Sequence, residues 1–333
     1  MGTRLRILAV AGLPALLAGT ACSGGRDALT IYSGRDEALV APLLEDFVEE
    51  TGIDVDIRYG DSGDLALLLE EEGDATPADV FLSQSPGPTT LVAEENGLAE
   101  LDGDVLDLVD ERWRGDGGRW VGVTARQRVL VYNTEIVSED ELPESVFDLV
   151  EPEYEGEVAL APTNASFQDF VTAMRQMEGE DAAREWLEGM VVNGSPTYAD
   201  NSSIVAAVGR GEIPMGLVNH YYNHRALEED PSLPSRNYVF RGGDLGSLLI
   251  DSTVGVIATT DQRESAERFV EFLLGEQAQE FFARETFEYP LASGAAAPEE
   301  LPPLEDASGP AVDLTTLGDL EATARMIADS GLL

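Results

Sequence analysis

An alternation of short apolar runs with longer amphipathic segments begins at residue 29, and it constrains the fold more than any other feature. Residues 29–32 predict a strand, residues 36–50 an amphipathic helix and residues 55–59 a second strand, which together make a βαβ unit. The series continues with a helix at 65–72, a strand at 79–82 and a helix at 89–96. This repetition indicates an α/β core with a parallel sheet.

A second series follows a long crossing segment. We expect strands at 122–124 and 129–132 to pass between two lobes, and an apolar strand at 246–259 to return to the first lobe. The other elements are expected as strands at 158–160 and 215–218 and helices at 164–177, 181–190, 202–209, 262–274, 276–283 and 316–331. The chain therefore predicts two interleaved lobes. We place the N-lobe at 29–125 plus about 250–292, the C-lobe at 126–249 plus about 311–333, and a surface connection at 293–310.

The N-terminus has the pattern of a secretory signal. Arg4 and Arg6 precede an apolar stretch at 7–17 and small residues up to position 21, so residues 1–21 are the expected signal peptide. Cys22, the only cysteine, resembles the acceptor cysteine of bacterial lipoproteins, although Gly19 stands where that family usually has leucine. We expect lipid attachment at Cys22, a linker at 22–28, and an extracytoplasmic protein held at its membrane.

The charge of the chain excludes one class of partner. The formal net charge is −44, and all 20 basic residues are arginine. Such an acidic protein repels nucleic acid phosphates and anionic lipid headgroups, so we expect no nucleic-acid partner. The charge by itself indicates a strongly solvated surface and no particular ligand.

Polar residues that directly follow strands are the first candidates for a binding site, because open α/β sheets bind ligands beyond the carboxyl ends of their strands. The strand at 215–218 is followed closely by Tyr221 and Tyr222. A phenolate is a hard anionic donor that suits a trivalent cation, and with a pKa near ~10 it forms at neutral pH only with help from a metal. On the dipeptide alone, two packed aromatic side chains are the stronger interpretation.

Several short motifs follow one another from about residue 29 to the C-terminus. They are Tyr32-Ser33-Gly34-Arg35, Pro77-Ala78-Asp79-Val80-Phe81, Trp120-Val121-Gly122-Val123, Arg126-Gln127-Arg128-Val129, PTNASFQ at 162–168, the tyrosine segment at 217–224 and Tyr289-Pro290-Leu291. In this order they resemble the bacterial ferric-ion-binding proteins of ABC iron importers. The resemblance implies a two-lobed periplasmic-binding-protein-like fold of type II, which closes over Fe(III) and a small anion and delivers the metal to an ABC permease. We expect a monomer that is not an enzyme.

The resemblance also implies metal ligands, residue by residue. Tyr221 and Tyr222 match the paired tyrosinate ligands of the family. In the best-known branch a histidine follows the Tyr-Ser-Gly-x motif, whereas this chain has Asp36 and then Glu37, whose carboxylates could reach the metal. That branch has a glutamate ligand after the Asp-Val-Phe strand, where Gln84 offers a neutral and weaker donor.

An anion gains importance when few anionic side chains bind the metal. The family's synergistic anion, carbonate or phosphate, would complete both the coordination and the charge balance. Asn164, Ala165 and Ser166 would open a helix whose free N–H groups suit an anion. Asn201 and Asn219 match anion-contacting asparagines of the family, and Arg126 could add a charged donor.

Two other interpretations stay open at this point. The first keeps the fold and makes the solute an oxyanion or a small organic molecule, bound by Asn164, Ser166, Asn201 and Arg126. The second is an extracellular metal-dependent hydrolase that uses His220, His224 and Asp36, and it lacks the glutamate of a His-Glu-x-x-His motif and a Gly-x-Ser-x-Gly elbow. We expect both histidines to be structural.

Overall fold

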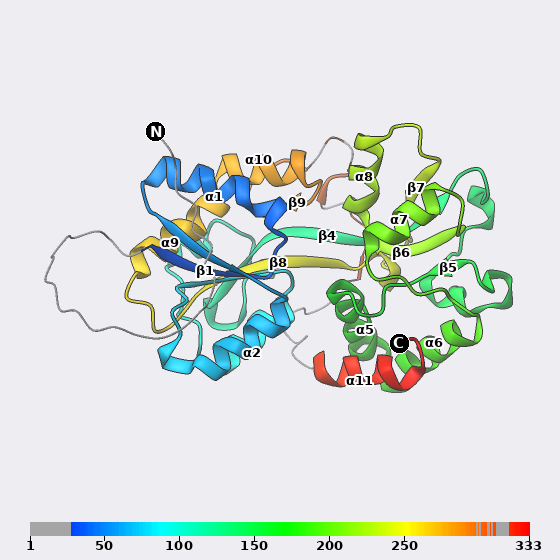
Figure 1. Ribbon diagram of the computed structural model, residues 1–333, viewed down its shortest axis with the longest axis horizontal. Helices are drawn as coiled ribbons and strands as arrows, with labels where there is room; N and C mark the ends of the chain where they lie inside the picture. The colour runs from blue at the N-terminus through cyan, green and yellow to red at the C-terminus, as the bar shows by residue number, and fades with distance from the viewer. Residues whose placement is uncertain (1–27, 298, 300, 305–306, 308, 311–319) are drawn as a thin grey trace, which may run out of the picture.

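The computed structural model describes residues 28–297, 299, 301–304, 307, 309, 310 and 320–333. The predicted signal peptide and Cys22 lie outside these residues. Within the described part of the chain, no helix is long and apolar enough to cross a membrane. The described residues form two lobes that are joined by long strands (Figure 1).

The N-lobe begins with the predicted βαβ unit. β1 (Leu29–Ser33) runs parallel to β2 (Val55–Tyr59), and α1 (Glu37–Thr51) connects them. β3 (Val80–Ser83) pairs with the other edge of β1, also in parallel. The apolar residues of α1 recur every three or four positions, so one face of the helix is buried: Leu39, Val40, Leu43, Leu44 and Phe47. The predicted parallel α/β core is confirmed.

The other N-lobe elements are α2 (Ser62–Glu72), α3 (Pro86–Glu94), α4 (Gly103–Leu106), α9 (Arg263–Leu273), α10 (Glu276–Glu285) and β9 (Tyr289–Pro290). Both α2 and α3 begin three residues earlier than the sequence pattern predicts. Asp61 caps α2 by accepting a hydrogen bond from the N–H of Gly63 at 2.8 Å. α3 starts on a proline, whose fixed φ suits the first helical position.

β4 (Trp120–Asn133) joins the lobes. It was predicted as two short strands, but it is one strand of 14 residues, all of them buried. Its first half pairs antiparallel with β8 (Leu249–Val256), and its second half pairs antiparallel with β6 (Met215–Asn219) and β7 (Ser235–Tyr238). The sheet order is β2-β1-β3-β8-β4-β6-β5, and β4 and β8 cross from one lobe to the other in Figure 1. The side chains at the middle of β4 therefore lie where the lobes meet.

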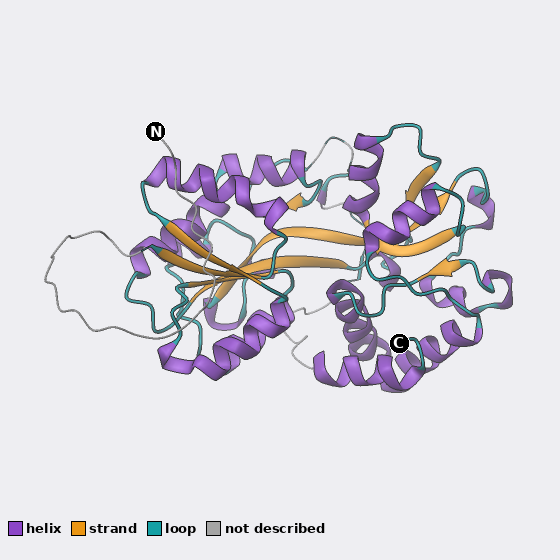
Figure 2. Ribbon diagram, in the orientation of Figure 1, coloured by secondary structure: helices purple, strands orange, loops and turns teal. Residues whose placement is uncertain are grey.

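The C-lobe surrounds the second half of β4 (Figure 2). Its short strand β5 (Val158–Ala159) runs parallel to β6. Its helices are α5 (Ala165–Glu178), α6 (Glu180–Val192), α7 (Asn201–Gly209), α8 (His220–Glu229) and α11 (Leu320–Ser330). α11 packs on α5, where the hydroxyls of Thr172 and Thr323 lie 2.7 Å apart. The first residues of the predicted helix at 316–331 lie outside the described residues.

Each lobe has its own hydrophobic core. In the N-lobe the ring of Phe47 meets that of Phe269 at 5.1 Å between centroids, and in the C-lobe Phe170 meets Trp186 at 5.5 Å. Two separate cores joined by crossing strands form an arrangement that permits hinge motion of one lobe against the other.

Candidate functional site

Tyr221 and Tyr222 lie in the first turn of α8, directly after β6. Their rings stack at 4.2 Å between centroids with an interplanar angle of 27°. Tyr221 is 1% exposed, whereas Tyr222 is partly exposed. The end of a strand places both phenols where the two lobes meet, so they can act on one ligand together.

The phenol of Tyr221 is strongly disposed to keep its proton. Burial raises the pKa of Tyr221 well above its ordinary value, and the neighbouring Tyr222 and Glu288 add to this rise while Arg126 opposes it. The free protein therefore holds a neutral phenol, and only a strongly Lewis-acidic cation would replace the proton.

Two arginines of β4 lie close to this pair. Arg126 and Arg128 point to the same face of the strand because they are two residues apart, and both side chains are buried. Arg128 Nη1 donates to Asn219 Oδ1 at 3.1 Å, and Arg126 Nε donates to Ser166 Oγ at 3.3 Å. Burial and the charge of Arg126 lower the pKa of Arg128 to about 9.

Much of the donor capacity of these arginines is unused. Among the described residues, Nη1 and Nη2 of Arg126 and Nε and Nη2 of Arg128 have no hydrogen-bond partner. The side-chain nitrogen of Asn201 is buried without a partner as well. Buried polar groups are normally hydrogen-bonded, so this concentration of free N–H groups indicates a place for a ligand with several acceptor oxygens.

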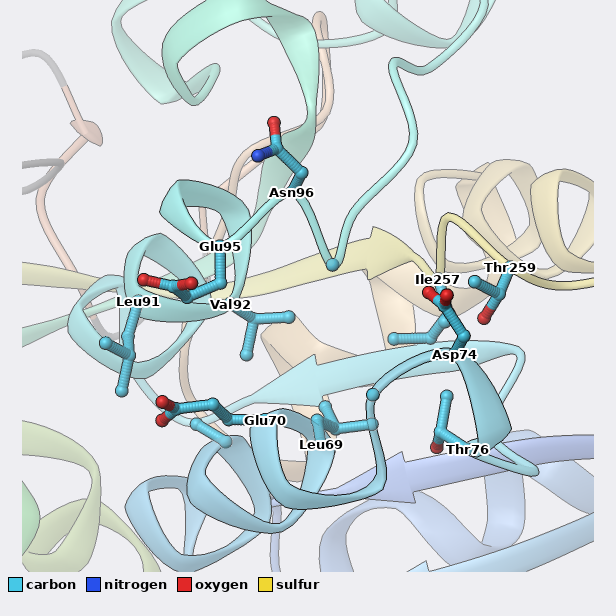
Figure 3. A pocket seen from close by; sticks show the side chains of 13 residues that line it. Leu69, Glu70, Asp74, Thr76, Leu91, Val92, Glu95, Asn96, Ile257 and Thr259 are labelled. Carbon is cyan, nitrogen blue, oxygen red and sulfur yellow. The ribbon is translucent and has the colours of Figure 1, made fainter.

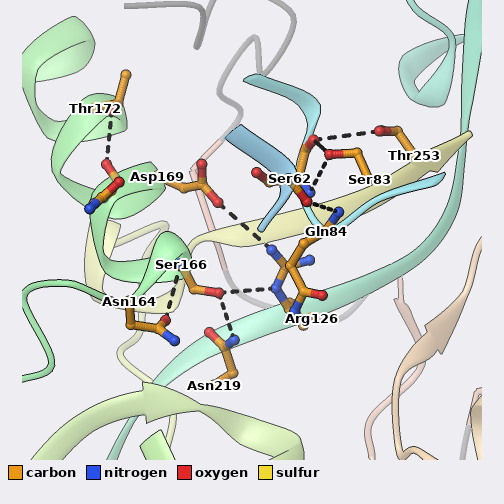
Figure 4. A network of polar contacts seen from close by, with 12 residues as sticks. Ser62, Ser83, Gln84, Arg126, Asn164, Ser166, Asp169, Thr172, Asn219 and Thr253 are labelled. Carbon is orange, nitrogen blue, oxygen red and sulfur yellow. Dashed lines mark hydrogen bonds and ion pairs between the residues drawn. The ribbon is translucent and has the colours of Figure 1, made fainter. Parts of the chain in front are cut away.

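The N-terminus of α5 lies against the same arginines. The side chain of Asn164 caps the helix by accepting from the N–H of Ser166 at 3.1 Å, and Asn219 Nδ2 donates to Ser166 Oγ at 2.9 Å. Figure 4 shows the side chains of Ser166 and Asp169 reaching toward Arg126. The structure thus brings together Asn164, Ser166, Asn201, Asn219 and Arg126, and it adds Arg128, which the sequence did not single out.

Asp169 is the carboxylate nearest to the arginine pair. Its Oδ2 lies 3.7 Å from Arg126 Nη2, and both side chains are almost fully buried. Burial raises the pKa of Asp169 to about 6, while Arg126 and the hydroxyl of Ser85 act to lower it. Ser85 precedes α3 of the N-lobe, so this carboxylate also lies at the boundary between the lobes.

The predicted N-lobe ligands are more exposed to solvent than Tyr221. Asp36 and Glu37 are exposed at the start of α1, and neither side chain has a hydrogen bond or ion pair among the described residues. Gln84 is partly exposed, and its backbone N–H donates to Ser62 Oγ at 2.9 Å. The described residues contain no group of three or more His, Cys, Asp or Glu placed to hold a metal ion. All the metal donors, the two phenols included, stay a prediction.

A buried ion pair of the N-lobe interacts electrostatically with the tyrosines. Arg35, at the end of β1, donates to both carboxylate oxygens of Glu288 at 2.9 and 2.6 Å. Thr286 and Thr124 also donate to this carboxylate. Burial lowers the pKa of Arg35, but the charge and hydrogen bonds of Glu288 outweigh this effect and raise it, and the tyrosine pair adds to the rise.

His220 and His224 do not form an open metal pair. Both ring nitrogens of His220 are occupied, by the N–H of Gln127 at 3.0 Å and by the carbonyl oxygen of Phe287 at 2.7 Å. The ring of His224 stacks on that of Phe287 at 5.7 Å. The expectation that the histidines are structural agrees with this geometry.

A separate cavity of about 170 Å³ lies between α2 and α3 of the N-lobe (Figure 3). Its apolar wall includes Leu69 and Val92, and the carboxylates of Glu70, Asp74 and Glu95 surround it. It shares no lining residue with the tyrosines or the arginines.

Comparison with known proteins finds relatives that match most of the chain. Residues 75–312 match the family model described as bacterial extracellular solute-binding protein. The chain is 34% identical over 95% of its length to the Fe(3+)-binding periplasmic protein of Serratia marcescens, of which it covers 94%.

Solved structures show the same fold. Iron-bound HitA from Pseudomonas aeruginosa superimposes with a TM-score of 0.87 at 33% identity, with 91% of this chain and 99% of that chain covered. A Trichodesmium protein in complex with iron and citrate gives a TM-score of 0.79 at 25% identity, with 92% and 99% covered. The predicted two-lobed α/β fold is confirmed.

Proposed function

This chain belongs to the ferric-ion-binding members of the bacterial extracellular solute-binding protein family, and we propose that Tyr221 and Tyr222 bind the Fe(III) that it delivers to an ABC permease. It is a binding protein and not an enzyme, so the hydrolase interpretation is wrong. The observation that carries the proposal is the stacked phenol pair, with Tyr221 buried and Tyr222 partly exposed, beside two buried arginines with free N–H groups.

The chemistry of the phenols suits ferric ion. Because the pKa of Tyr221 is raised, its phenol is neutral in the free protein. A weakly Lewis-acidic cation does not displace this proton, whereas Fe(III) is acidic enough to displace the protons of both phenols. Two phenolates then supply two hard anionic oxygens. Asp36, with its neighbour Glu37 as the alternative carboxylate, and Gln84 are the proposed N-lobe donors, and they would reach the metal as the lobes close.

The arginine side of the site is proposed to hold the synergistic anion, carbonate or phosphate. Arg126, Ser166, Asn201 and Asn219 supply side-chain donors, and Asn164, Ala165 and Ser166 supply the start of a helix, where free N–H groups and the dipole favour negative charge. Arg128 adds a second guanidinium. The citrate in the Trichodesmium complex is an oxygen-rich anion of the same general kind.

The protein acts outside the cytoplasm, as its relatives do. We propose that Cys22 carries a lipid that holds it at the membrane beside the permease, and that the protein works as a monomer. Release of the metal would follow from opening of the lobes or from protonation of the phenolates, because metal and proton compete for the same oxygens.

A visible absorption titration tests the metal site. Metal-free protein is titrated with chelated ferric ion, with and without carbonate or phosphate, and the tyrosinate charge-transfer band is followed. We expect one saturable equivalent, lost in Y221F/Y222F while circular dichroism stays unchanged. Retained binding in both single variants would contradict the ligand assignment, and absence of a band with every anion would favour an oxyanion or small organic solute.

A further inference from the structure

A groove of about 430 Å³ runs along the C-lobe between α7 and α8, which pack side by side (Figure 1). Both helices begin at the site, α7 with the buried Asn201 and α8 directly after β6. Tyr222 lines the groove at this inner end, and Leu233, which lies close to Gly209 at the end of α7, lines the outer end. The groove therefore leads away from a proposed metal ligand, and its volume falls in the range of small-molecule sites, roughly 300–1,000 Å³.

The floor of the groove is apolar. Val205 on α7 is 2% exposed, and Tyr222 and Ala226 on α8 pack against the hydrophobic cluster to which Val205 belongs. Tyr222 is thus part of the tyrosine pair and of the groove wall at the same time. A molecule that reaches the metal beside Tyr222 can extend over this floor without leaving the C-lobe.

The charged side chains differ between the two ends of the groove. Arg225 lies one turn beyond the tyrosine pair on α8, and among the described residues it has no hydrogen bond or ion pair. At the outer end Arg210 is neutralised by Glu212, with contacts of 2.7 and 2.9 Å, and Glu229 and Asp230 add negative charge. The inner half therefore offers an unpaired guanidinium to an anionic group, whereas the outer half repels one.

The chemistry of ferric ion requires that it arrives with a chelator. A trivalent cation lowers the pKa of its bound water strongly, so at neutral pH ferric ion hydrolyses unless other donors hold it. While the lobes are open, the proposed N-lobe donors do not reach the metal, and the two phenols alone do not fill its coordination sphere. Oxygens of the chelator must then occupy the other positions, so the rest of the chelator lies on the C-lobe beside Tyr222.

We propose that the groove holds a free carboxylate arm of a ferric polycarboxylate complex against Arg225 while the phenols take over the metal. Each phenol that binds the metal releases its proton, and an oxygen of the chelator leaves the metal in exchange. The inference rests on the proposed ferric site, and it names the class of complex that supplies this site. Arg225 is a specificity-determining residue in this step and not a metal ligand.

Two ferric chelates test the proposal. Ferric citrate, kept in excess citrate, presents free carboxylates, whereas every carboxylate of ferric nitrilotriacetate is bound to the metal. Metal-free protein is mixed with each chelate by stopped flow, and the rate constant of transfer is read from the tyrosinate charge-transfer band. We expect the ratio of the citrate to the nitrilotriacetate rate constant to fall at least about tenfold in R225Q. R236Q removes the same charge from an exposed arginine of β7 on the same lobe, and its ratio should stay within about twofold of wild type.

Two further variants separate charge from structure. R225K keeps the charge and should restore most of the ratio, while A206W fills the groove from an exposed position of α7 and should lower the ratio as R225Q does. An unchanged ratio in R225Q, an equal fall in R236Q or no recovery in R225K would overturn the proposal, and these three variants decide the matter if A206W does not fold. If wild type takes metal from neither chelate, the ferric site fails and the role of the groove fails with it. If all variants take metal with the wild-type ratio, the ferric site stands and only the role of the groove fails.

Discussion

Nε2 of His220 lies 2.7 Å from the carbonyl oxygen of Phe287, and this contact connects the helix of the tyrosine pair to the N-lobe. Nδ1 of the same ring accepts a hydrogen bond from the N–H of Gln127 on β4, so the neutral ring carries its proton on Nε2 and donates it to Phe287. Phe287 has a φ of 56°, an uncommon conformation for a non-glycine residue, and the hydrogen bond helps to maintain it.

Substitution H220Q should therefore destabilise the protein in a pH-dependent way. We expect a loss of about 2 kcal/mol at pH 7.5, because a glutamine cannot make both contacts. Burial and His224 lower the pKa of His220 to about 4, so between pH 6.5 and 4 the unfolded wild-type chain takes up a proton that the folded protein refuses. Wild type loses stability as pH falls through this window, and the variant does not.

Urea unfolding followed by tryptophan fluorescence at pH 7.5 and 5 measures this effect. The gap between wild type and H220Q should narrow at pH 5. R225Q, a change on the same helix that leaves both hydrogen bonds of His220 in place, is the control and should follow the pH dependence of wild type. An equally wide gap for H220Q at both pH values would show that His220 is not a neutral bridge.

The local pattern of the sequence was enough to predict the parallel core but not to predict β4 as one continuous strand. The βαβ unit has apolar strands and an amphipathic helix, and these periodicities are local. β4 contains Thr124, Arg126 and Arg128 among apolar residues, so it resembles two short strands separated by a polar turn. Its continuity depends on strands that are distant in sequence, above all β8 and β6.

The binding site, like the fold, could be predicted from the sequence only in part. The tyrosine pair was predicted because two hard phenol donors closely follow a strand and because the motifs around them resemble those of ferric-ion-binding proteins. Glu288 was missed because its partner Arg35 is 253 residues away and nothing near it in sequence indicates a buried ion pair. Arg128 and Asp169 were missed because charged residues usually lie at the surface, and only tertiary packing shows that these two are buried.

The Arg35–Glu288 pair should be costly to break from one side. R35M leaves a fully buried carboxylate without its charged partner, and we expect a destabilisation of roughly 3–5 kcal/mol. The double variant R35M/E288M removes both charges, so it should recover a large part of that loss. A double-mutant cycle of R35M, E288M and the double variant, measured by urea unfolding, gives the coupling energy between the two side chains. Additive effects of the two single variants would contradict this prediction.

Asp251 should limit stability above neutral pH. Its carboxylate is 1% exposed, its Oδ1 has no partner among the described residues, and burial raises its pKa to about 7. A carboxyl group with a raised pKa stabilises the fold below its unfolded pKa, and this contribution is lost as pH rises from about 4 to 7. D251N should therefore be more stable than wild type by at least about 1 kcal/mol at pH 8, and the gain should shrink toward pH 4. Thermal unfolding of both proteins across this pH range measures the difference in stability between D251N and wild type. A difference that does not change with pH would exclude titration of Asp251 as its cause.

The N-lobe carboxylates give the last prediction. Asp36 and Glu37 are neighbours at the exposed start of α1, and Asp36 is the one that directly follows the Tyr-Ser-Gly-Arg motif of β1. If Asp36 reaches the metal when the lobes close, D36N should weaken ferric binding about tenfold, since one charged donor is replaced by a neutral one. E37Q changes the same charge one residue away and should alter affinity by less than about twofold, as expected for a screened surface charge. Competition with a ferric chelator, read from the charge-transfer band, measures both. Equal affinities for D36N and E37Q would mean that surface charge alone acts here, and that the anion and solvent complete the coordination begun by Tyr221 and Tyr222.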